Sequence, residues 1–587
     1  MRITTARRIS QVFFLLLLLW LGVATTIGPA WWGPQTQYFA FGVPWQMRNW
    51  PVNWLLQLDP LVAISTALAT GTVYAGLAWA AVTIIATILL GRFVCGWVCP
   101  FGTMHQFFGW LAHRSRPMKQ RIEANRYRRA QSVRYYILAA LLAAVLIRPG
   151  SLLIGLLDPI PLAYRSVTLA VLPLADAHTQ KLAAAQRFYE WSWLIGAVFL
   201  AALAANFVVP RFYCRFICPL GALLGVAGRF AIFRVGKAAP QCSNCAACEA
   251  ACEGACNPSG QIRTAECVLC MNCLHACPDA EMRYGRMRSA AGEIASPDVS
   301  RRGLLLSLVG GAAAVPLMRL GGKTAFNWNA SIIRPPGALD EERFLQRCIR
   351  CGQCMKICPT NVIQPGGLAG GLETLWTPVL NNRIGTSGCQ LNCVACGGVC
   401  PTAAIRPISL DEKLGRGHFA SAGPIRLGTA FVDRGRCLPW AMDTPCIVCQ
   451  ENCPVSPKAI FVREEFSTIR GGSATVKGAS GDRIELTEVA FSDGQLAGGD
   501  YYCLVGGSRR RIQANQRAAI VLSGESPELP QPGEAVEIQV RLQRPYVDVR
   551  ACIGCGVCEH ECPVSGRRAI RVTAENESRS RKRSLLL

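Results

Sequence analysis

The chain has 587 residues, of which 51% are hydrophobic and 30 are cysteine, and its formal net charge is +24. A small disulfide-stapled fold is excluded by this length, and the tight clustering of most cysteines favours metal ligation. The basic excess does not indicate nucleic-acid binding, because many lysines and arginines lie beside apolar segments. A chain of this length is expected to contain several domains.

Four apolar stretches precede residue 211, at roughly residues 12–28, 72–91, 135–157 and 191–210. Each has about the length that a helix needs to cross a ~30 Å hydrocarbon core. The alternative is a set of buried helices in a soluble fold, but four such stretches in one half of a chain are hard to bury. Residues 1–236 are therefore predicted to form a four-helix transmembrane domain.

The distribution of basic residues predicts the orientation of these spans. Residues 1–11 contain three basic residues, loop 92–134 contains nine against one acid, and residues 211–237 contain five and no acid. The intervening loops, 29–71 and 158–190, contain one and three. Because basic loops stay in the cytoplasm, both the N-terminus and the segment after the fourth span are expected to lie inside.

An internal repeat lies at the predicted cytoplasmic ends of the second and fourth spans. The segment GRFVCGWVCPFGTMHQFFG aligns without gaps with PRFYCRFICPLGALLGVAG. The repeated cysteines are Cys95, Cys99, Cys214 and Cys218. Four converging thiolates would hold a metal or a cluster. The alternative is that the thiols are free and that the repeated proline and glycines only end the helices.

Two cysteine motifs with bacterial-ferredoxin spacing follow at residues 237–299. They comprise Cys242, Cys245, Cys248, Cys252, Cys267, Cys270, Cys273 and Cys277. In such pairs three close cysteines surround one cubane cluster and the fourth ligates the other cluster. Zinc is the less favoured alternative, because zinc sites use separated C-x2-C pairs. A cytoplasmic two-cluster ferredoxin domain is predicted.

The fourth ligand of the first motif has two candidates. The regular spacing favours Cys252, whereas Pro258 near Cys256 favours Cys256 instead.

Residues 300–322 have the features of an export signal in the middle of the chain. Arg301 and Arg302 precede an apolar stretch at 303–320, as in twin-arginine signals. Such a segment predicts a fifth membrane crossing and two joined proteins, a cytoplasm-facing membrane ferredoxin and an exported one. The alternative is a soluble linker helix, because Arg319 interrupts the apolar stretch.

Four more cysteine motifs follow, and they predict a four-cluster ferredoxin domain at 340–462 and 545–572. They comprise Cys348, Cys351, Cys354, Cys358, Cys389, Cys393, Cys396, Cys400, Cys437, Cys446, Cys449, Cys453, Cys552, Cys555, Cys558 and Cys562. The first and last motifs are regular, and the two middle motifs have longer first gaps. The chain is therefore expected to bind about six [4Fe-4S] clusters.

Residues 463–544 alternate apolar and polar side chains between turn signals and are predicted to be a β-rich insertion. Cys503 stands alone there and is expected to be a small core residue. The chain ends in a basic tail, 573–587, in which ENESRSRKRS at 575–584 is expected to be disordered. The predicted fold class is thus a helical membrane domain of four to five transmembrane helices, α+β bacterial-ferredoxin-like domains and a β-rich insertion.

These motifs resemble a known pair of protein families. Residues 1–285 resemble the NapH and MauN family in their four spans, two C-x3-C-P motifs and ferredoxin tail, and residues 300–572 resemble the NapG and MauM family of twin-arginine-exported polyferredoxins. The resemblance implies a fusion of the two. In nitrate-reductase systems it also implies oxidation of quinol and delivery of electrons to the periplasm.

The expected function is electron transfer from membrane quinol to a periplasmic redox protein by a multi-pass inner-membrane protein. Its C-terminal ferredoxin domain would be periplasmic, and it would act as the electron-transfer subunit of a quinol dehydrogenase. His105, six residues past Cys99, is a candidate proton acceptor for quinol. The alternative is an accessory, maturation or redox-sensing protein for a periplasmic metalloenzyme.

Overall fold

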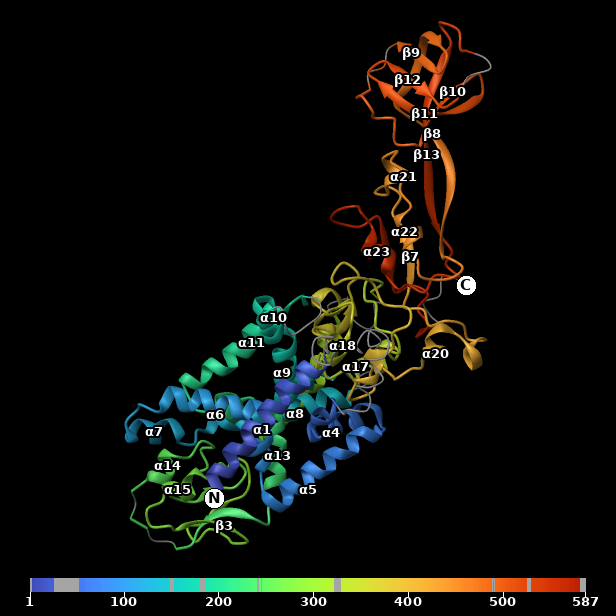
Figure 1. The fold of residues 1–587 in the computed structure, drawn as a ribbon. Coiled ribbons are helices and arrows are strands. Elements are labelled where there is room, and N and C mark those ends of the chain that lie inside the picture. Colours follow the sequence, from blue (N-terminus) through green and yellow to red (C-terminus); the bar gives the residue numbers. More distant parts are fainter. Residues whose placement is uncertain are drawn as a thin grey trace, which may run out of the picture. The chain divides into compact units, whose positions relative to one another are not determined.

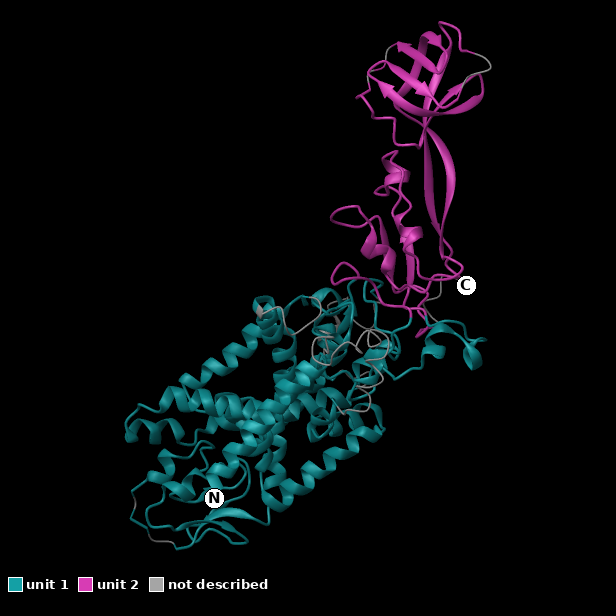
Figure 2. Cartoon of the chain, viewed as in Figure 1, with its two compact units in different colours: residues 1–381, 392–425 teal, residues 382–391, 426–587 magenta. Residues whose placement is uncertain are grey.

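The computed structural model describes residues 3–25, 52–147, 152–179, 186–239, 242–243, 245–320, 329–487, 489, 491–524 and 529–580. The chain forms two compact units (Figure 2). Unit 1 comprises Met1–Asn381 and Asn392–Ile425, and unit 2 comprises Asn382–Leu391 and Arg426–Leu587.

Helices occupy the four predicted spans of unit 1, with different lengths. They are α1 (Ile3–Ala24), η3 and α5 (Ala75–Trp79 and Ala80–Leu90), α8 (Val133–Leu146), and α11 with η8 (Ser192–Ala204 and Ala205–Phe207). Among the described residues α1 alone is long and apolar enough to cross a membrane unaided, and the other apolar helices are shorter. Residues 26–28 and 148–151 of the predicted spans lie outside the described residues.

The two segments predicted as loops between spans also contain helices. Helix α4 (Pro60–Thr70) lies in the first, and α9 (Pro159–Ser166), the π-helical η7 (Val167–Val171) and α10 (Leu172–Thr179) follow one another in the second. Asp59 and Asp158 cap α4 and α9, and proline occupies the first helical position in both. Their apolar runs are too short to predict a span, which is why the hydropathy pattern missed them.

The remaining helices of this helical domain are short or follow the C-x3-C-P motifs. They are α3 (Trp54–Gln57), η4 (Val94–Val98), α6 (Pro100–His113), α7 (Met118–Asn125), η5 (Arg129–Ser132), η6 (Leu153–Leu156), α12 (Phe212–Phe216) and α13 (Pro219–Gly228). Buried side chains from α1, α3, α4, α6, α8, α9 and α13 form one apolar core.

Two ferredoxin segments belong to unit 1. The first contains β1 (Arg234–Lys237) antiparallel to β3 (Met282–Gly285), β2 (Ile262–Arg263) parallel to β4 (Glu293–Ile294), and the helices α14 (Ala247–Ala250) and α15 (Asn272–Ala276). The second contains α17 (Glu341–Leu345), α18 (Gln353–Ile357), β5 (Ile363–Pro365) antiparallel to β6 (Pro378–Leu380), α19 (Ala395–Gly398) and α20 (Leu410–Leu414). Figure 1 shows α14, α15 and β3 near one end of α1, and α17 and α18 near the other.

The predicted export segment forms one helix, α16 (Arg301–Leu320), which packs against α8. The amide N–H of Ser300, just before α16, donates a 2.8 Å hydrogen bond to the hydroxyl of Tyr136 early in α8, and Val315 packs with Ala144 near the end of α8. The two helices therefore run in parallel. A Cβ added at Gly311 would lie 2.0 Å from the carbonyl oxygen of Ala140, so glycine is required for this close approach.

Two adjacent glycines of α16 allow a matched test of this packing. We expect Gly311→Leu to separate α16 from α8 and to destabilise unit 1 by about 1–3 kcal/mol, the usual cost of overpacking. Gly310→Leu should have little effect, because nothing lies within 4 Å of a Cβ at that position. Thermal unfolding and limited proteolysis at 300–320 would measure the difference, and equal behaviour of the two variants would contradict the packing.

Unit 2 combines a ferredoxin segment with a closed β-barrel. The ferredoxin segment contains β7 (Thr429–Val432) antiparallel to β14 (Ile570–Thr573), with α21 (Leu438–Ala441), α22 (Val448–Glu451) and α23 (Val557–Glu561). The barrel has strand order β10-β11-β12-β9-β8-β13 and occupies the predicted β-rich insertion. Its strands are β8 (Ile460–Ser480), β9 (Arg483–Thr487), β10 (Tyr501–Val505), β11 (Ser508–Gln516), β12 (Ala519–Leu522) and β13 (Ala535–Val547). Cys503 is completely buried in its apolar core.

The unit boundaries differ from the predicted domains in two places. The predicted four-cluster domain is divided, because 340–381 and 392–425 belong to unit 1 and the rest to unit 2. The start of the tail is ordered, since Ser578 exchanges hydrogen bonds with Arg426 and both Asn576 and Glu577 are buried. Residues 581–587 of the tail lie outside the described residues.

Candidate functional site

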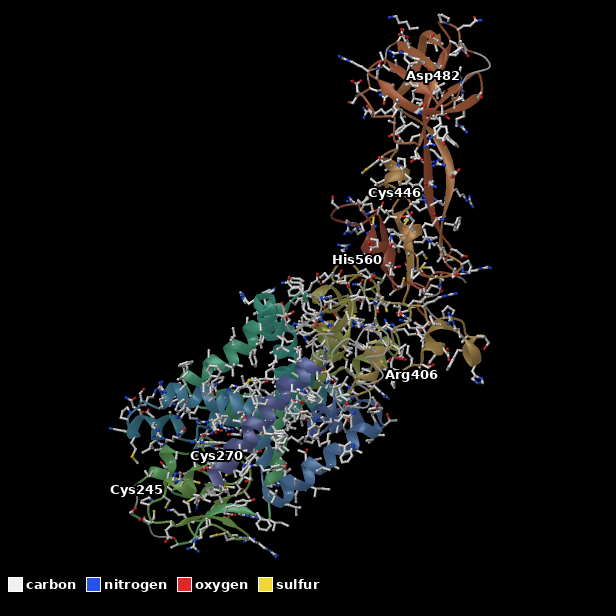
Figure 3. All side chains as sticks on the ribbon, viewed as in Figure 1. Cys245, Cys270, Arg406, Cys446, Asp482 and His560 are labelled. Carbon is white, nitrogen blue, oxygen red and sulfur yellow. The ribbon has the colours of Figure 1, made fainter. Side chains whose placement is uncertain are left out.

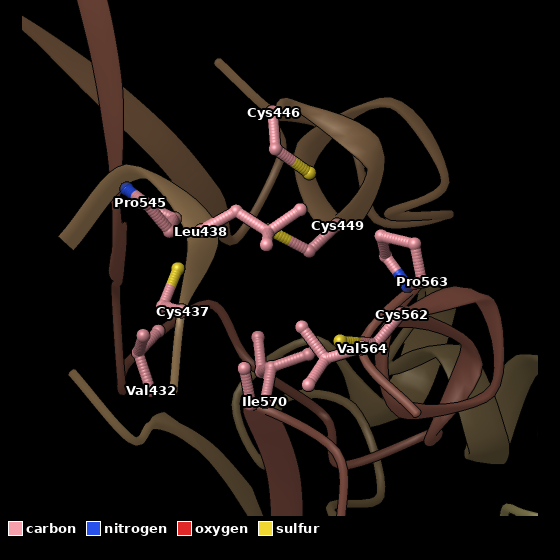
Figure 4. A pocket seen from close by; sticks show the side chains of 11 residues that line it. Val432, Cys437, Leu438, Cys446, Cys449, Pro545, Cys562, Pro563, Val564 and Ile570 are labelled. Carbon is pink, nitrogen blue, oxygen red and sulfur yellow. The ribbon is translucent and has the colours of Figure 1, made fainter. Parts of the chain in front are cut away.

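Four cysteines from two separate motifs line one cavity in unit 2. Figure 4 shows Cys437, Cys446 and Cys449 around the cavity together with Cys562 of the last motif. The other lining residues are Val432, Leu438, Pro545, Pro563, Val564, Ala569 and Ile570. An apolar chamber with four thiols is the environment that a [4Fe-4S] cluster requires.

A second cavity in unit 2 contains the reciprocal combination. It is lined by Cys552, Cys555 and Cys558 of the last motif together with Cys453, the fourth cysteine of the preceding motif. The two motifs therefore exchange their fourth cysteines, as expected for paired ferredoxin clusters. Strand β7 precedes the first of these motifs and β14 follows the second, and the antiparallel pairing of the two strands holds the motifs together.

A third cavity of the same kind lies in unit 1. Cys348, Cys351 and Cys354 line it with Cys400, the fourth cysteine of the next motif. Of the other cysteines in these two motifs, Cys358, Cys393 and Cys396 also belong to unit 1, whereas Cys389 belongs to unit 2. The N–H of Cys389 donates a 2.7 Å hydrogen bond to the carbonyl oxygen of Cys555 there.

The regular cysteine loops share an unusual backbone conformation. The residue after the second cysteine has a positive φ in all four regular motifs, at Ala246, Met271, Gly352 and Gly556. In the three motifs where the residue before the second cysteine is described, at Leu269, Arg350 and Gly554, that residue has a positive φ as well. Such turns direct successive N–H groups to one side, where they stabilise negative charge. In the looped motifs, Val394 and Ile447 occupy the corresponding positions with negative φ.

Backbone N–H groups point at the cysteine sulfurs of unit 2. The N–H of Ala430 lies 3.4 Å from Cys552 Sγ, and those of Trp440 and Val557 point at Cys437 and Cys555. Burial nevertheless raises the pKa of Cys437 to about 11 and that of Cys555 to about 12. The thiols are therefore protonated at neutral pH, and ligation to iron would release these protons.

These arrangements fit iron–sulfur clusters better than single metal ions. Among the described residues no three cysteine, histidine or acidic side chains come together closely enough to hold one ion. Thiols spaced around a chamber fit a cluster, whose outer irons are ligated separately. A bound cluster would supply reversible one-electron transfer, and the chain supplies the ligands, the N–H groups and the apolar walls.

The first ferredoxin segment brings its two motifs together as well. Cys277 lies within electrostatic range of Cys248, and Cys252 lies within range of Cys273 together with Cys267 and Cys270. Cys256, the alternative to Cys252, lies with its sulfur 3.3 Å from that of Cys252 and also contacts Cys267. Both candidate sulfurs therefore reach the same site. Figure 3 labels Cys245, which is exposed, and Cys270, which is buried.

The two copies of the C-x3-C-P repeat contact each other reciprocally. Arg92 of the first copy packs against Gly221 and Gly228 of the second, and the segment around Arg211 of the second packs against Gly102 and Gly109 of the first. These three positions, one arginine and two glycines, recur in the repeat because each copy provides both halves of the same contact. The alignment of the two copies already contained the shared arginine and glycines. It did not show which of these residues contact each other.

This pairing brings the four repeat thiols into one region. Cys99 and Cys218 are the N-caps of α6 and α13, and their sulfurs accept hydrogen bonds from Gly102 N (3.4 Å) and Gly221 N (3.1 Å). Cys95, Cys99 and Cys214 all act electrostatically on Cys218. The buried guanidinium of Arg92 lies 3.8 Å from Cys95 Sγ.

The repeat thiols adjoin the first ferredoxin segment. Arg211 interacts with both Cys214 and Cys270, and Arg92 donates a 2.6 Å hydrogen bond to Ala265 O. A buried ion pair between Arg134 and Glu266 holds the same loop. Buried arginines at one end of the helical domain therefore connect the repeat thiols to the first ferredoxin segment.

Each end of the helical domain contacts one cysteine loop of a ferredoxin segment in the same way. At one end a Cβ on Gly96 would lie 2.2 Å from Val268 O, and Trp97 donates a 3.0 Å hydrogen bond to Leu269 O. At the other end a Cβ on Gly155 would lie 2.1 Å from Ile349 O, and Arg165 donates a 2.9 Å hydrogen bond to Arg350 O. Both loops lie between the first and second cysteines of a motif. Sequence reasoning did not identify these glycines, because a close approach between distant segments leaves no local pattern.

His105 lies inside the helical domain and not in a loop. It is completely buried on α6, its Nδ1 is 2.6 Å from Asn206 Nδ2, and its ring stacks on that of Tyr213 at 5.9 Å. Its Nε2 has no hydrogen-bond partner among the described residues. The structure therefore places this candidate on Tyr213, the residue directly before the repeat cysteine Cys214.

Comparison with known proteins agrees with these sites. A family model described as a 4Fe-4S binding domain matches residues 72–119 and 189–238, which contain the two repeat copies. A second model with the same description matches residues 344–364. The cavities lined by four cysteines agree with these matches. Together they define the chain as a ferredoxin-type iron–sulfur electron-transfer protein.

The chain belongs to the family of the ferredoxin-type proteins NapG and MauM. It is 33% identical to NapG of Escherichia coli (strain K12) over 185 residues, which are 31% of this chain and 74% of NapG. It is 31% identical over 218 residues to the methylamine utilization ferredoxin-type protein MauM of Methylophilus methylotrophus, covering 35% of this chain and 89% of MauM.

A further relative is matched only in part. The chain is 31% identical to protein NirI of Paracoccus denitrificans (strain Pd 1222) over 237 residues, which are 38% of this chain and 32% of NirI. The chain thus spans about a third of the length of that relative. No solved structure matches the chain.

Proposed function

We propose that this protein carries electrons from membrane quinol to a redox protein in the periplasm. The observation that carries the proposal is the matching attachment of a ferredoxin loop at each end of the helical domain, at Gly96 and at Gly155. The family of the chain supports electron transfer, and the direction and the partners are part of the proposal.

The length of α1 is compatible with the two ends lying on opposite sides of a membrane. Near its start Arg7 donates a 3.1 Å hydrogen bond to Asn272 of the first ferredoxin segment. Just after its end Thr25 lies 2.9 Å from Tyr164, which in turn contacts Gln353 of the second. A helix of this length rises about 33 Å, close to the ~30 Å of a hydrocarbon core.

The proposed topology has the N-terminus in the cytoplasm and the C-terminus in the periplasm. The basic loops favour this orientation. The parallel packing of α16 on α8 favours a fifth crossing, because both helices would then leave the cytoplasm. On this proposal the chain is a fusion of a NapH- and MauN-type membrane ferredoxin with a NapG- and MauM-type polyferredoxin, and it carries about six [4Fe-4S] clusters.

Export of the second half is testable through the twin arginines. We expect replacement of both Arg301 and Arg302 by lysine to leave a reporter fused after residue 580 in the cytoplasm, because twin-arginine export depends on that pair. A reporter fused within 115–130 should stay cytoplasmic in both proteins. A periplasmic C-terminal reporter in the lysine variant would show that export does not use this signal, and a cytoplasmic one in the unchanged protein would refute the topology.

The quinol step itself is testable with the purified protein. Reduced quinol should bleach the visible absorption of the clusters, as a chemical reductant does. Reduction by the chemical reductant alone would instead favour the accessory, maturation or sensing role.

A further inference from the structure

A pair of buried aspartates lies in the helical domain, and it has no part in the cluster sites or in the proposed quinol step. The sequence Leu-Asp-Pro occurs at 58–60 and again at 157–159, at the starts of α4 and α9. Both Asp59 and Asp158 are completely buried. Each carboxyl group acts on the other at close range, so the two lie close enough to share a proton.

One oxygen of each carboxyl group has a clear structural role. Asp59 Oδ1 accepts a 2.9 Å hydrogen bond from Leu61 N, and Asp158 Oδ1 accepts a 3.4 Å hydrogen bond from Ile160 N. The two Oδ2 atoms receive no hydrogen bond from any N–H or O–H donor in the described part of the chain. A carboxyl–carboxyl hydrogen bond needs a proton on one side, because two adjoining carboxylates cannot both be ionised when buried.

The aspartate pair lies between the repeat thiols and the second ferredoxin segment. Tyr213 donates a 2.5 Å hydrogen bond to Leu157 O, next to Asp158, and is also in electrostatic range of Cys214 and Cys218. On the other side, Asp158 is three residues after Gly155, which contacts Ile349 between two cysteines of the second segment. A proton held there would balance the charge of an electron that passes between the two regions.

We propose that Asp59 and Asp158 form a proton-binding pair that shares one proton at rest and takes up a second when quinol is oxidised. The second half of this proposal rests on the proposed function. Oxidation of one quinol to quinone releases two electrons and two protons. The electrons leave to the iron–sulfur sites, one proton converts the pair from a monoanion to two neutral acids, and the other goes to water. The pair later returns its proton to water as the electrons leave.

The pair can be tested by infrared spectroscopy of the full-length protein, independently of its activity. We expect a carbonyl band from a protonated carboxyl group that shifts in D2O and is lost in both Asp59→Asn and Asp158→Asn. Asparagine is also a good N-cap, so both helix starts should be retained. Asp482→Asn, at an exposed turn labelled in Figure 3, is the control and should keep the band.

The exchange role is tested by reducing the same variants with a quinol analogue and, separately, with a chemical reductant. We expect the quinol-driven rate to fall by about 100-fold in each asparagine variant, the usual scale for a lost proton-transfer group, with unchanged iron content and chemical reduction. In the unchanged protein the band should grow during quinol oxidation.

Each part of the proposal has its own contradicting result. Absence of the band in the unchanged protein would overturn the shared proton. A normal quinol-driven rate in both variants, or a band that does not change during turnover, would overturn the exchange role while the proposed function stands. Failure of quinol to reduce the unchanged protein would refute the proposed function and with it the exchange role, and the band would still decide whether the proton is shared.

Discussion

Replacing Cys562 by alanine is expected to remove the cluster enclosed by Cys437, Cys446 and Cys449, and not the one enclosed by the other cysteines of its own motif. The reason is the exchange of fourth cysteines between the two motifs of unit 2. Iron should fall by about four atoms per chain, because one [4Fe-4S] cluster is lost.

Double variants separate this pairing from the simpler one in which each motif holds its own cluster. Cys562→Ala combined with Cys449→Ala should lose no more iron than Cys562→Ala alone, since both cysteines line one cavity. The double variant of Cys562→Ala with Cys558→Ala should lose about eight iron atoms per chain, because two clusters are affected. The reverse pattern of iron loss would contradict the cavities of unit 2.

Replacing any one of Cys95, Cys99, Cys214 and Cys218 by alanine is expected to abolish quinol-driven reduction of the clusters. The four thiols act on one another, and the reciprocal contacts of the repeat place them beside the first ferredoxin segment. Iron content should remain that of the unchanged protein if the site holds no iron of its own, and should fall by the same amount in all four variants if it does.

Equivalent cysteines in the two repeat copies provide an internal control for this prediction. The variants at Cys95 and Cys214, which occupy the same repeat position, should fail to the same degree. Cys503→Ala should reduce normally, because that thiol is buried in the core of the barrel. Normal rates in all four repeat variants would show that the motifs only end helices, with proline and glycine as the operative residues.

The spacing of the cysteines predicted which residues gather, because a ferredoxin loop is a local structure. For the two motifs at 237–299 it also predicted the exchange of the fourth cysteine, which follows from the known ligation of paired clusters. Which motifs pair in the second half of the chain was not predictable from the spacing. The motif that begins at Cys389 is divided between the two compact units, and this division was not predictable. Cys389 precedes a longer gap, and spacing does not reveal that it belongs to a different compact unit from Cys393.

The helical domain was predicted less completely, for two physical reasons. Hydropathy identifies long apolar runs, so it missed α4 and α9, which begin at capped Asp-Pro sequences and are short. Close approaches between distant segments depend on tertiary packing. Gly96 and Gly155 are therefore ordinary glycines in sequence, although each lies against a ferredoxin loop.

The proposed path across the membrane is tested most directly with protein inserted into sealed vesicles in one orientation, with reduced quinol in the bilayer. An acceptor dye that cannot cross the bilayer is added on the side of the C-terminal unit, and its reduction is recorded. We predict reduction of the dye on that side that requires the protein and disappears in the Cys99→Ala variant. Reduction only of dye placed on the N-terminal side would contradict the account.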